Sequence, residues 1–202
     1  APHFFPYQPE DVAEYYLALA TRLRGPVLIY NLPQFTSGLP PELIGRLVRS
    51  HPWIIGVKDS SGSLSAVREL SSSGKPAGVR LAGHDAVLAA GLREGVLDGS
   101  ISGIAGVVPE LNVRLSSALA VNDEAEVRIL EGLQKEFVEQ LGTLPVPWGL
   151  KLIAAHLGLD TGALPMPLSG ARRETVASFL LWWEDWRERA APLLGLRPAE
   201  AG

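Results

Sequence analysis

Two residues at the ends of apolar runs are the strongest candidates for chemistry in this sequence. Tyr30 follows the run Val27–Ile29, and Lys58 follows the run Trp53–Val57. An amine attacks a carbonyl carbon only when unprotonated, so a lysine used in this way needs its pKa lowered from the usual ~10.4, chiefly by desolvation. A nearby phenol can carry protons to and from the addition product. These two residue types therefore suit the formation of an imine between a lysine and a carbonyl compound.

Each candidate also has an ordinary structural interpretation. A lysine at a strand end is often only solvated, and a buried tyrosine commonly only packs and makes one hydrogen bond. His84 and Asp85, together with Asp59, would also allow a metal site, but none of the four histidines has the paired spacing of metal ligands. We expect imine chemistry without a metal or a cofactor, and residue types alone leave the structural interpretations open.

The elements around these residues follow a regular alternation between about residues 26 and 120. Short apolar runs, each followed by a helical pattern, are found at 27–30, 53–58, 79–83 and 99–104. This rhythm predicts right-handed βαβ units and a parallel sheet, with the first strand buried on both faces. Ligands bind at the carboxyl ends of such strands, so Tyr30 and Lys58 should lie at one rim on adjacent strands.

The alternation ends in the last third of the chain, where only helices are expected. Amphipathic or apolar helical segments cover 123–141, 147–157 and 171–189. Asp123 and Glu126 have the spacing of a capping box at the start of the first segment. Trp182, Trp183 and Trp186 in the last segment are expected to pack that helix or a subunit contact rather than to bind a ligand.

The composition narrows the class of protein. Apolar residues make up 47% of the 202 residues and charged residues 20%, as in globular proteins, and the net charge is −4. No basic cluster suggests nucleic acid, and no apolar run approaches the ~18 residues of a membrane span. The absence of cysteine excludes disulfides and thiolate catalysis. We therefore expect a soluble, cytoplasmic protein that binds neither nucleic acid nor membranes.

Several short motifs come in an order typical of one enzyme family. They are Tyr30-Asn31-Leu32-Pro33 with Thr36 and Gly38, then 56–62 (Gly-Val-Lys-Asp-Ser-Ser-Gly), 83–85 (Gly-His-Asp), 98–103 (Asp-Gly-Ser-Ile-Ser-Gly), and 145–147 (Pro-Val-Pro) with Lys151. On these motifs the sequence resembles the dihydrodipicolinate synthase / N-acetylneuraminate lyase family of class I aldolases. The tyrosine and lysine motifs at their mutual spacing are the specific part of the match.

The resemblance implies a TIM (β/α)8 barrel with extra C-terminal helices. Residues 1–122 would be the second half of the barrel, about strands 5–8, and residues 123–202 a helical extension packed on it. Ala1–Phe5 resembles the end of the fourth strand of the family, and a barrel needs about 250 residues. The first part, with a Gly-Thr-Thr-Gly-Glu-like loop that binds the substrate carboxylate, is thus expected to be missing. A homo-oligomer, either a homotetramer or a dimer, is implied as well.

The resemblance also implies roles for individual residues. Lys58 would form the Schiff base with pyruvate or another 2-oxo acid, and Tyr30 would relay protons. The backbone of Gly83 and Ile101 would line the bound 2-oxo acid. Two further residues would contact the rest of the substrate, namely Ser60 and Asp85. The enamine formed from the imine could then add to an aldehyde or be released by cleavage of a carbon–carbon bond.

One departure from the family bears on the substrate. Dihydrodipicolinate synthases typically carry an arginine just after the Tyr-Asn-x-Pro motif, where it holds a carboxylate, but this chain has Gln34-Phe35-Thr36. We therefore expect an aldolase or lyase acting on 2-oxo-3-deoxy or 4-hydroxy-2-oxo acids. The alternatives are a dihydrodipicolinate synthase, which joins pyruvate to aspartate semialdehyde, and a non-catalytic truncated barrel.

Overall fold

The computed structural model describes residues 5–72 and 77–196. By its internal contacts the chain divides into two compact units, Ala1–Ser102 and Gly103–Gly202. The boundary expected from the sequence, at residues 122/123, would place α5 (Pro109–Ala120) with the α/β part, whereas α5 packs against α6 (Glu124–Leu141) within the second unit. The boundary at residues 122/123 was predicted between the barrel part and its helical extension, and it stays a prediction.

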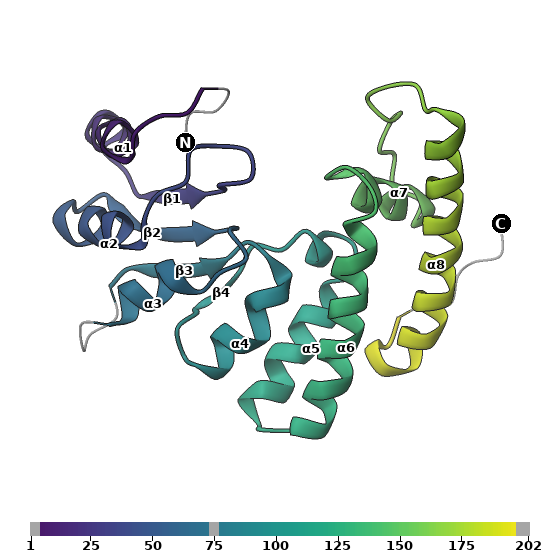
Figure 1. Cartoon of the computed structure of the whole chain (residues 1–202). Coiled ribbons are helices and arrows are strands. Elements are labelled where there is room, and N and C mark those ends of the chain that lie inside the picture. Colours follow the sequence, from purple (N-terminus) through teal and green to yellow (C-terminus); the bar gives the residue numbers. More distant parts are fainter. Residues whose placement is uncertain (1–4, 73–76, 197–202) are drawn as a thin grey trace. The chain divides into compact units, whose positions relative to one another are not determined.

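The first unit is an α/β layer with four parallel strands in the order β1-β2-β3-β4 (Figure 1). The four parallel strands predicted from the sequence are therefore confirmed. In chain order the elements are α1 (Pro9–Leu23), β1 (Val27–Asn31), α2 (Pro41–Ser50), β2 (Ile54–Asp59), α3 (Ser65–Ser71), β3 (Val79–Ala82), the 3-10 turn η1 (Asp85–Val87), α4 (Leu88–Arg93) and β4 (Gly99–Ser100).

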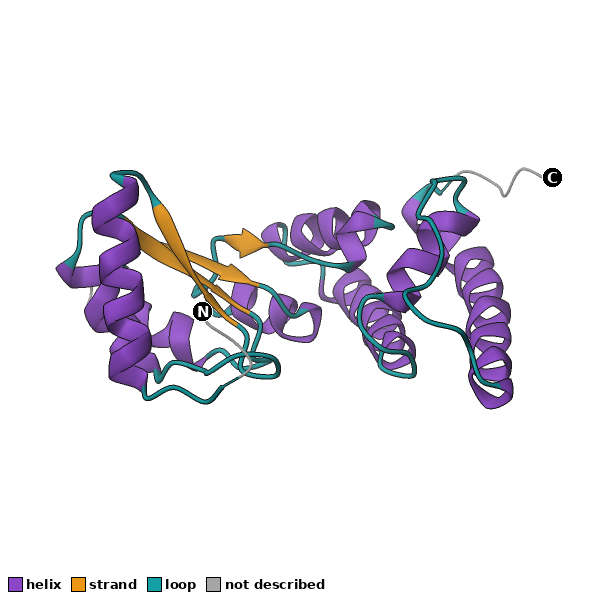
Figure 2. Ribbon diagram, turned by 90° about the horizontal axis from the view of Figure 1, so that it is seen from above, coloured by secondary structure: helices purple, strands orange, loops and turns teal. Residues whose placement is uncertain are grey.

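The strand order explains where the helices lie. Each strand pairs with the next one along the chain, so right-handed crossovers place every connecting helix on the same side of the sheet. Figures 1 and 2 show the helices of this unit gathered along that side. A doubly wound sheet instead reverses its strand order at a switch point. The described strands show no such reversal, which is the arrangement found in a segment of a barrel.

The two faces of the strands differ in burial. Val27 and Ile29 in β1 and Val57 in β2 are buried on the face that the helices cover. The alternate residues face the other way, and the side chain of Tyr30 is 41% exposed there. The expectation that β1 is buried on both faces is therefore wrong among the described residues, because helices cover only one face.

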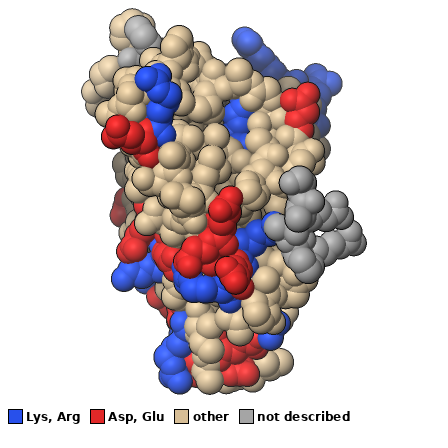
Figure 3. All heavy atoms as spheres, turned by 90° about the vertical axis from the view of Figure 1, so that its right-hand side faces the viewer, with Lys and Arg blue, Asp and Glu red and all other residues tan. Residues whose placement is uncertain are grey.

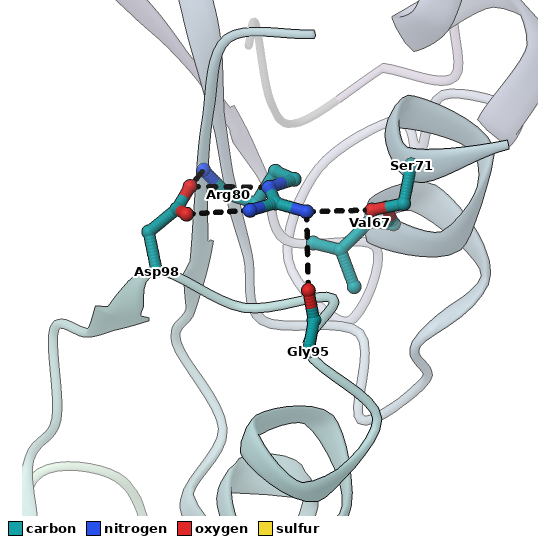
Figure 4. Close-up of polar contacts among 5 residues, drawn as sticks. All are labelled: Val67, Ser71, Arg80, Gly95 and Asp98. Atoms are coloured by element: carbon teal, nitrogen blue, oxygen red, sulfur yellow. Dashed lines mark hydrogen bonds and ion pairs between the residues drawn. The ribbon is translucent and has the colours of Figure 1, made fainter. Parts of the chain in front are cut away.

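The buried side chain of Arg80 links the amino ends of β3 and β4 to the end of α3 (Figure 4). The Arg80 guanidinium donates to both carboxylate oxygens of Asp98, at 2.5 and 3.1 Å, and to Ser71 Oγ at 2.8 Å and Gly95 O at 3.4 Å. The main-chain N–H of Arg80 also donates to Asp98 Oδ2 at 2.9 Å. These bonds to Arg80 hold the pKa of Asp98 below its ordinary value. These bonds fix the start of β3, at the amino end of the strand.

The second unit consists of helices, as the sequence predicted. After a 3-10 turn, η2 (Ile104–Gly106), it contains α5, α6, α7 (Trp148–His156) and α8 (Gly170–Leu194). The Asp123 carboxylate accepts the N–H of Glu126 at 3.0 Å, which confirms Asp123 as the N-cap of α6. The other half of the predicted capping box is not formed, because the Glu126 carboxylate bonds to Arg114 and the N–H of Asp123 donates to Ala118 O. The last helix continues five residues beyond the predicted end at residue 189, with Pro192 inside its final turn.

Aromatic residues form the core of the second unit. Trp183 and Trp186 are fully buried and stack at a centroid distance of 5.7 Å, and Phe137 from α6 meets both edge-on. The indole N–H of Trp186 donates to Leu133 O at 3.2 Å, and that of Trp182 donates to Glu136 Oε1 at 2.7 Å. The expectation that these tryptophans pack a helix is confirmed.

Several charged side chains on the surface of the second unit form ion pairs. Arg189 bonds to Glu136 at 2.7 Å and to Asp185 at 2.8 Å, and the bond between Arg189 and Glu136 lowers the pKa of Glu136. Figure 3 shows acidic and basic side chains lying next to one another rather than a field of one sign. Among the helices that the structure describes, none is long and apolar enough to span a membrane.

Candidate active site

Tyr30 and Lys58 lie side by side at the carboxyl ends of β1 and β2. They are direct partners in the parallel register of the two strands. Because their side chains project from the same face, Lys58 Nζ lies 4.2 Å from the centroid of the Tyr30 ring. An ammonium group at this distance is attracted by the ring face. The structure therefore brings together the two residues that the sequence singled out.

The next pair in the register fixes this arrangement from the opposite face. Asn31 and Asp59 are buried, and the Asn31 amide donates to Asp59 Oδ2 at 2.9 Å. The other oxygen of Asp59 accepts the N–H of Ser61 at 2.7 Å, and Asn31 Oδ1 accepts that of Leu39 at 3.1 Å. Since successive side chains of a strand alternate between faces, this pair directs its neighbours, Tyr30 and Lys58, to the other side.

Gly83 lies close to both Ser60 and the lysine. A β-carbon on Gly83 would lie 1.9 Å from Ser60 Oγ and 2.7 Å from Lys58 Cε, so only glycine fits there without movement. Ser60 is 5% exposed, and its hydroxyl has no hydrogen-bond partner among the described residues. A buried hydroxyl without a partner is costly, so Ser60 Oγ is a group that a bound ligand would satisfy.

The remaining predicted site residues lie at the same carboxyl edge, one and two strands beyond Lys58. Asp85 is buried and begins the turn η1 after β3, where the neighbouring His84 Nδ1 accepts the N–H of Ala86 at 3.3 Å. Ile101 follows β4, and its N–H donates to Ala82 O at 2.8 Å, while its side chain is largely exposed. Their predicted contacts with substrate stay predictions.

The loop after β1 forms the rim beside Tyr30. The side-chain amide of Gln34 donates to Ser60 O at 2.9 Å, which anchors this loop to the turn after β2. Phe35 beside it is 62% exposed. The segments that follow the four strands, 31–40, 59–64, 82–87 and 101–102, contain no lysine or arginine. Lys58 is thus the only lysine or arginine that the ends of β1–β4 and these segments contribute.

Two contacts of the site escaped the sequence interpretation. One is the anchoring role of Gln34, and the other is the hydroxyl of Tyr16 on α1, which bonds to the main chain of Tyr30. The sequence motifs do not single out Tyr16, which lies on the buried face of α1. A phenol on a face that is otherwise apolar is the one signal in the sequence that would have marked it, since a buried tyrosine needs a partner for its hydroxyl.

The histidine and the acids do not form a metal centre. Among the residues that the structure describes, no three or more His, Asp or Glu side chains are grouped so as to hold an ion. Asp59, one of the three residues considered, uses both carboxylate oxygens for Asn31 and Ser61.

Comparison with known proteins assigns the chain to a family. The model of the Dihydrodipicolinate synthetase family matches residues 1–180. The chain belongs to this family. The resemblance inferred from the motifs is thereby confirmed, and the α/β fold with its four parallel strands agrees with TIM-barrel structures of the family. That it corresponds to the second half of the barrel remains a prediction.

Relatives of two activities match about equally well. The N-acetylneuraminate lyase of Rhizobium meliloti is 29% identical over 192 residues, which cover 91% of this chain and 63% of the relative. The 4-hydroxy-tetrahydrodipicolinate synthase of Stenotrophomonas maltophilia is 30% identical over 173 residues, 84% of this chain and 57% of the relative. The chain thus spans less than two thirds of these relatives, and sequence identity does not separate the two activities.

Solved structures match over nearly the whole chain. A variant of the Sulfolobus solfataricus 2-keto-3-deoxygluconate aldolase superposes with a TM-score of 0.82 at 21% identity, covering 98% of this chain and 67% of that one. A prophage protein of the dihydrodipicolinic acid synthase family from E. coli K12, solved in complex with pyruvate, gives 0.78 at 25% identity, with 92% and 64% covered. At identities this low, the first of these shows the fold alone.

Proposed function

We propose that this protein is a class I aldolase or lyase in which Lys58 forms a Schiff base with pyruvate or another 2-oxo acid. The observation that carries the proposal is the position of Lys58 Nζ, 4.2 Å from the centroid of the Tyr30 ring at paired positions of adjacent strands. Membership of a family that contains lyases and synthases supports it. The four strands would be the second half of the barrel, and the C-terminal helices its extension.

The reaction would proceed through an imine and an enamine. The neutral amine of Lys58 adds to the ketone carbon, and the oxygen takes up protons and leaves as water, which gives an iminium ion. Loss of a proton from the adjacent carbon converts the iminium ion into an enamine, whose carbon adds to an aldehyde carbon. The reverse sequence cleaves the same carbon–carbon bond, and water finally releases the lysine. Tyr30 would carry the protons, because its phenol ring adjoins the amine.

The other site residues would hold the substrate. Ser60 would bind it through its unpartnered, buried hydroxyl, and Gly83 would leave the space for the lysine adduct. The backbone of Ile101 would line the bound 2-oxo acid. Asp85 at the start of η1 would contact the hydroxyl-bearing part of the substrate. No metal or cofactor is needed for these steps.

The charge of the strand-end segments supports an uncharged aldehyde partner. They provide no lysine or arginine besides Lys58, and the Gln34 amide is already bonded to Ser60 O. A carboxylate on the aldehyde would therefore find no fixed guanidinium fork here. The substrates that fit are 2-oxo-3-deoxy or 4-hydroxy-2-oxo acids with a neutral, hydroxyl-bearing tail.

Reductive trapping tests the proposal. Incubation of the folded protein with pyruvate and borohydride should attach one pyruvate-derived group to Lys58, identified by peptide mass mapping. Lys58→Arg should abolish the adduct. Lys135→Arg is the matched control, because Lys135 is an exposed lysine on α6 and should leave the adduct unchanged. A folded protein that forms no adduct would contradict the proposal.

A non-catalytic truncated barrel is the second candidate, favoured by the fact that the chain spans 63% and 57% of two relatives. It predicts a folded protein that binds no 2-oxo acid. The dihydrodipicolinate synthase alternative predicts faster turnover of pyruvate with aspartate semialdehyde than of hydroxylated 2-oxo acids. A homo-oligomer, a dimer or tetramer, is also proposed, and light scattering coupled to size-exclusion chromatography would measure it.

A further inference from the structure

Asn31 and Asp59, which we call the amide–carboxylate pair, form a continuous chain of hydrogen bonds with two main-chain groups. The N–H of Leu39 donates to Asn31 Oδ1 at 3.1 Å, and Asn31 Nδ2 donates to Asp59 Oδ2 at 2.9 Å. The N–H of Ser61 donates to Asp59 Oδ1 at 2.7 Å. The two residues of the pair are 6% and 4% exposed, so water does not replace these bonds. The chain therefore begins and ends at main-chain N–H groups, which can only donate.

The two donors at the ends determine which side chains can lie between them. Together the side chains must offer three acceptor oxygens and one N–H donor group, which one amide and one carboxylate supply. Two amides would leave two N–H groups facing each other in a buried place, and two carboxylates would place two negative oxygens against each other. The requirement is symmetrical, because it does not determine which of the two positions carries the carboxylate.

The amide–carboxylate pair holds the ends of the two strands that carry the candidate site. Its members directly follow Tyr30 and Lys58 in the paired strands and project from the opposite face. The bond to Ser61 turns the chain after β2, and within that turn Ser60 N donates to Asn31 O at 2.8 Å. All of these contacts lie within β1, β2 and the segments that follow them, so they do not depend on any strand that precedes β1.

We propose that Asn31 and Asp59 are positioning residues for Tyr30 and Lys58, and that they act through their hydrogen bonds rather than through the charge of Asp59. Asparagine and aspartate should then be able to exchange places between the two positions. A role for the charge itself would instead require the carboxylate to stay directly after Lys58. The effect on catalysis rests on the proposed function, whereas the effect of the exchange on stability does not.

The exchange of the two side chains is tested first by stability. Asp59→Asn creates two facing amides and Asn31→Asp two facing carboxylates, so each single variant should unfold at a lower urea concentration than wild type. The double variant Asn31→Asp/Asp59→Asn again provides an acceptor for every donor and should return to the wild-type midpoint. Single variants as stable as wild type overturn the proposal. A double variant that does not fold, or that is no more stable than Asp59→Asn, overturns it as well.

The positioning role is tested by the rate of borohydride trapping at saturating pyruvate, measured without urea on proteins that circular dichroism shows to be folded. Asp59→Asn should be trapped about tenfold more slowly, because small displacements of a reacting group slow a reaction steeply. The double variant should be trapped within about twofold of the wild-type rate. Gln134→Glu is the matched control, since Gln134 is also buried and donates to Asn112 Oδ1 at 3.0 Å in the second unit. It should lower stability and leave the trapping rate unchanged.

Each other result of the trapping experiment has a definite meaning. A double variant that is as stable as wild type but is trapped as slowly as Asp59→Asn overturns the proposal, because the charge must then lie beside Lys58. Trapping of folded Asp59→Asn at the wild-type rate also overturns it, because the pair is then only structural. If neither single variant folds, the rate of the double variant alone decides. A wild type without adduct refutes the proposed function instead, and the unfolding midpoints still decide the exchange.

Discussion

Replacement of Gly83 by alanine probes the tightest packing at the candidate site. The added β-carbon would lie 1.9 Å from Ser60 Oγ, 3.1 Å from Ser60 Cβ and 2.7 Å from Lys58 Cε. Atoms cannot remain at the shortest of these separations, so the serine hydroxyl must turn and the end of the lysine must move. Because Ser60 is buried whereas the lysine chain is flexible, most of the strain should fall on the serine.

The size of the effect follows from this geometry. One added carbon in a filled site costs about 1–3 kcal/mol, so the free energy of unfolding of Gly83→Ala should fall by that amount. The amine of Lys58 should be displaced by about 1 Å, which slows a positioned reaction about a hundredfold. Urea unfolding followed by circular dichroism measures the first quantity, and the time course of borohydride trapping with pyruvate measures the second.

A second substitution isolates the serine contact. In the Gly83→Ala background, Ser60→Ala removes the oxygen at 1.9 Å but leaves the contacts with Cβ and with Lys58. About 1 kcal/mol of stability should return while trapping stays slow, and the double-mutant cycle should show this coupling. If Gly83→Ala is as stable as wild type and is trapped at the same rate, the packing argument is wrong. The stability measurement holds whether or not the protein is an aldolase.

Three further results are expected elsewhere in the molecule. Asp98→Asn leaves the buried Arg80 without its carboxylate, so urea unfolding should show a loss of about 1–3 kcal/mol, a range reduced because Asp98 is 42% exposed. Because Arg80 lowers the pKa of Asp98, the Asp98 carboxylate contributes fully to stability above its ordinary pKa of 3.8, and this contribution is lost as the pH falls below that value. The thermal stabilities of wild type and Asp98→Asn should therefore converge at low pH. A difference that stays constant with pH would contradict the ion pair between Arg80 and Asp98. Phe137→Ala opens a cavity beside Trp183 and Trp186 and should cost about 3–5 kcal/mol, with a shift in tryptophan fluorescence; an unchanged emission spectrum would contradict the described core.

The sequence was sufficient to predict a helix or strand where a local pattern of residues determines it. Val27–Ile29 is a continuous apolar run bounded by turn formers, and such a run has few alternatives to a strand in a parallel sheet. Consecutive strands of βαβ units usually pair, so Tyr30 and Lys58 at the ends of two successive runs were expected at one rim. For this reason the central pair of the site was accessible without the structure.

Other contacts could not be predicted from the sequence. They join two segments, and no local pattern determines how such segments lie relative to each other. Gln34 reaches Ser60 O across 26 residues, and Tyr16 reaches Tyr30 across 14. Each depends on the direction of one side chain from a loop or helix. The end of α8 differs for another reason: the segment was predicted to end at residue 189, whereas the helix continues to Leu194 and accommodates Pro192 inside its final turn.

The register between β1 and β2 has a consequence for how the protein folds. Tyr30 and Lys58 belong to a single βαβ unit, and the bond between Asn31 and Asp59 closes the same unit across 28 residues. The entropy lost in closing a chain segment grows only slowly with its length, but a short segment closes early and without waiting for distant strands. Tyr30 and Lys58 can therefore come together in one local folding event.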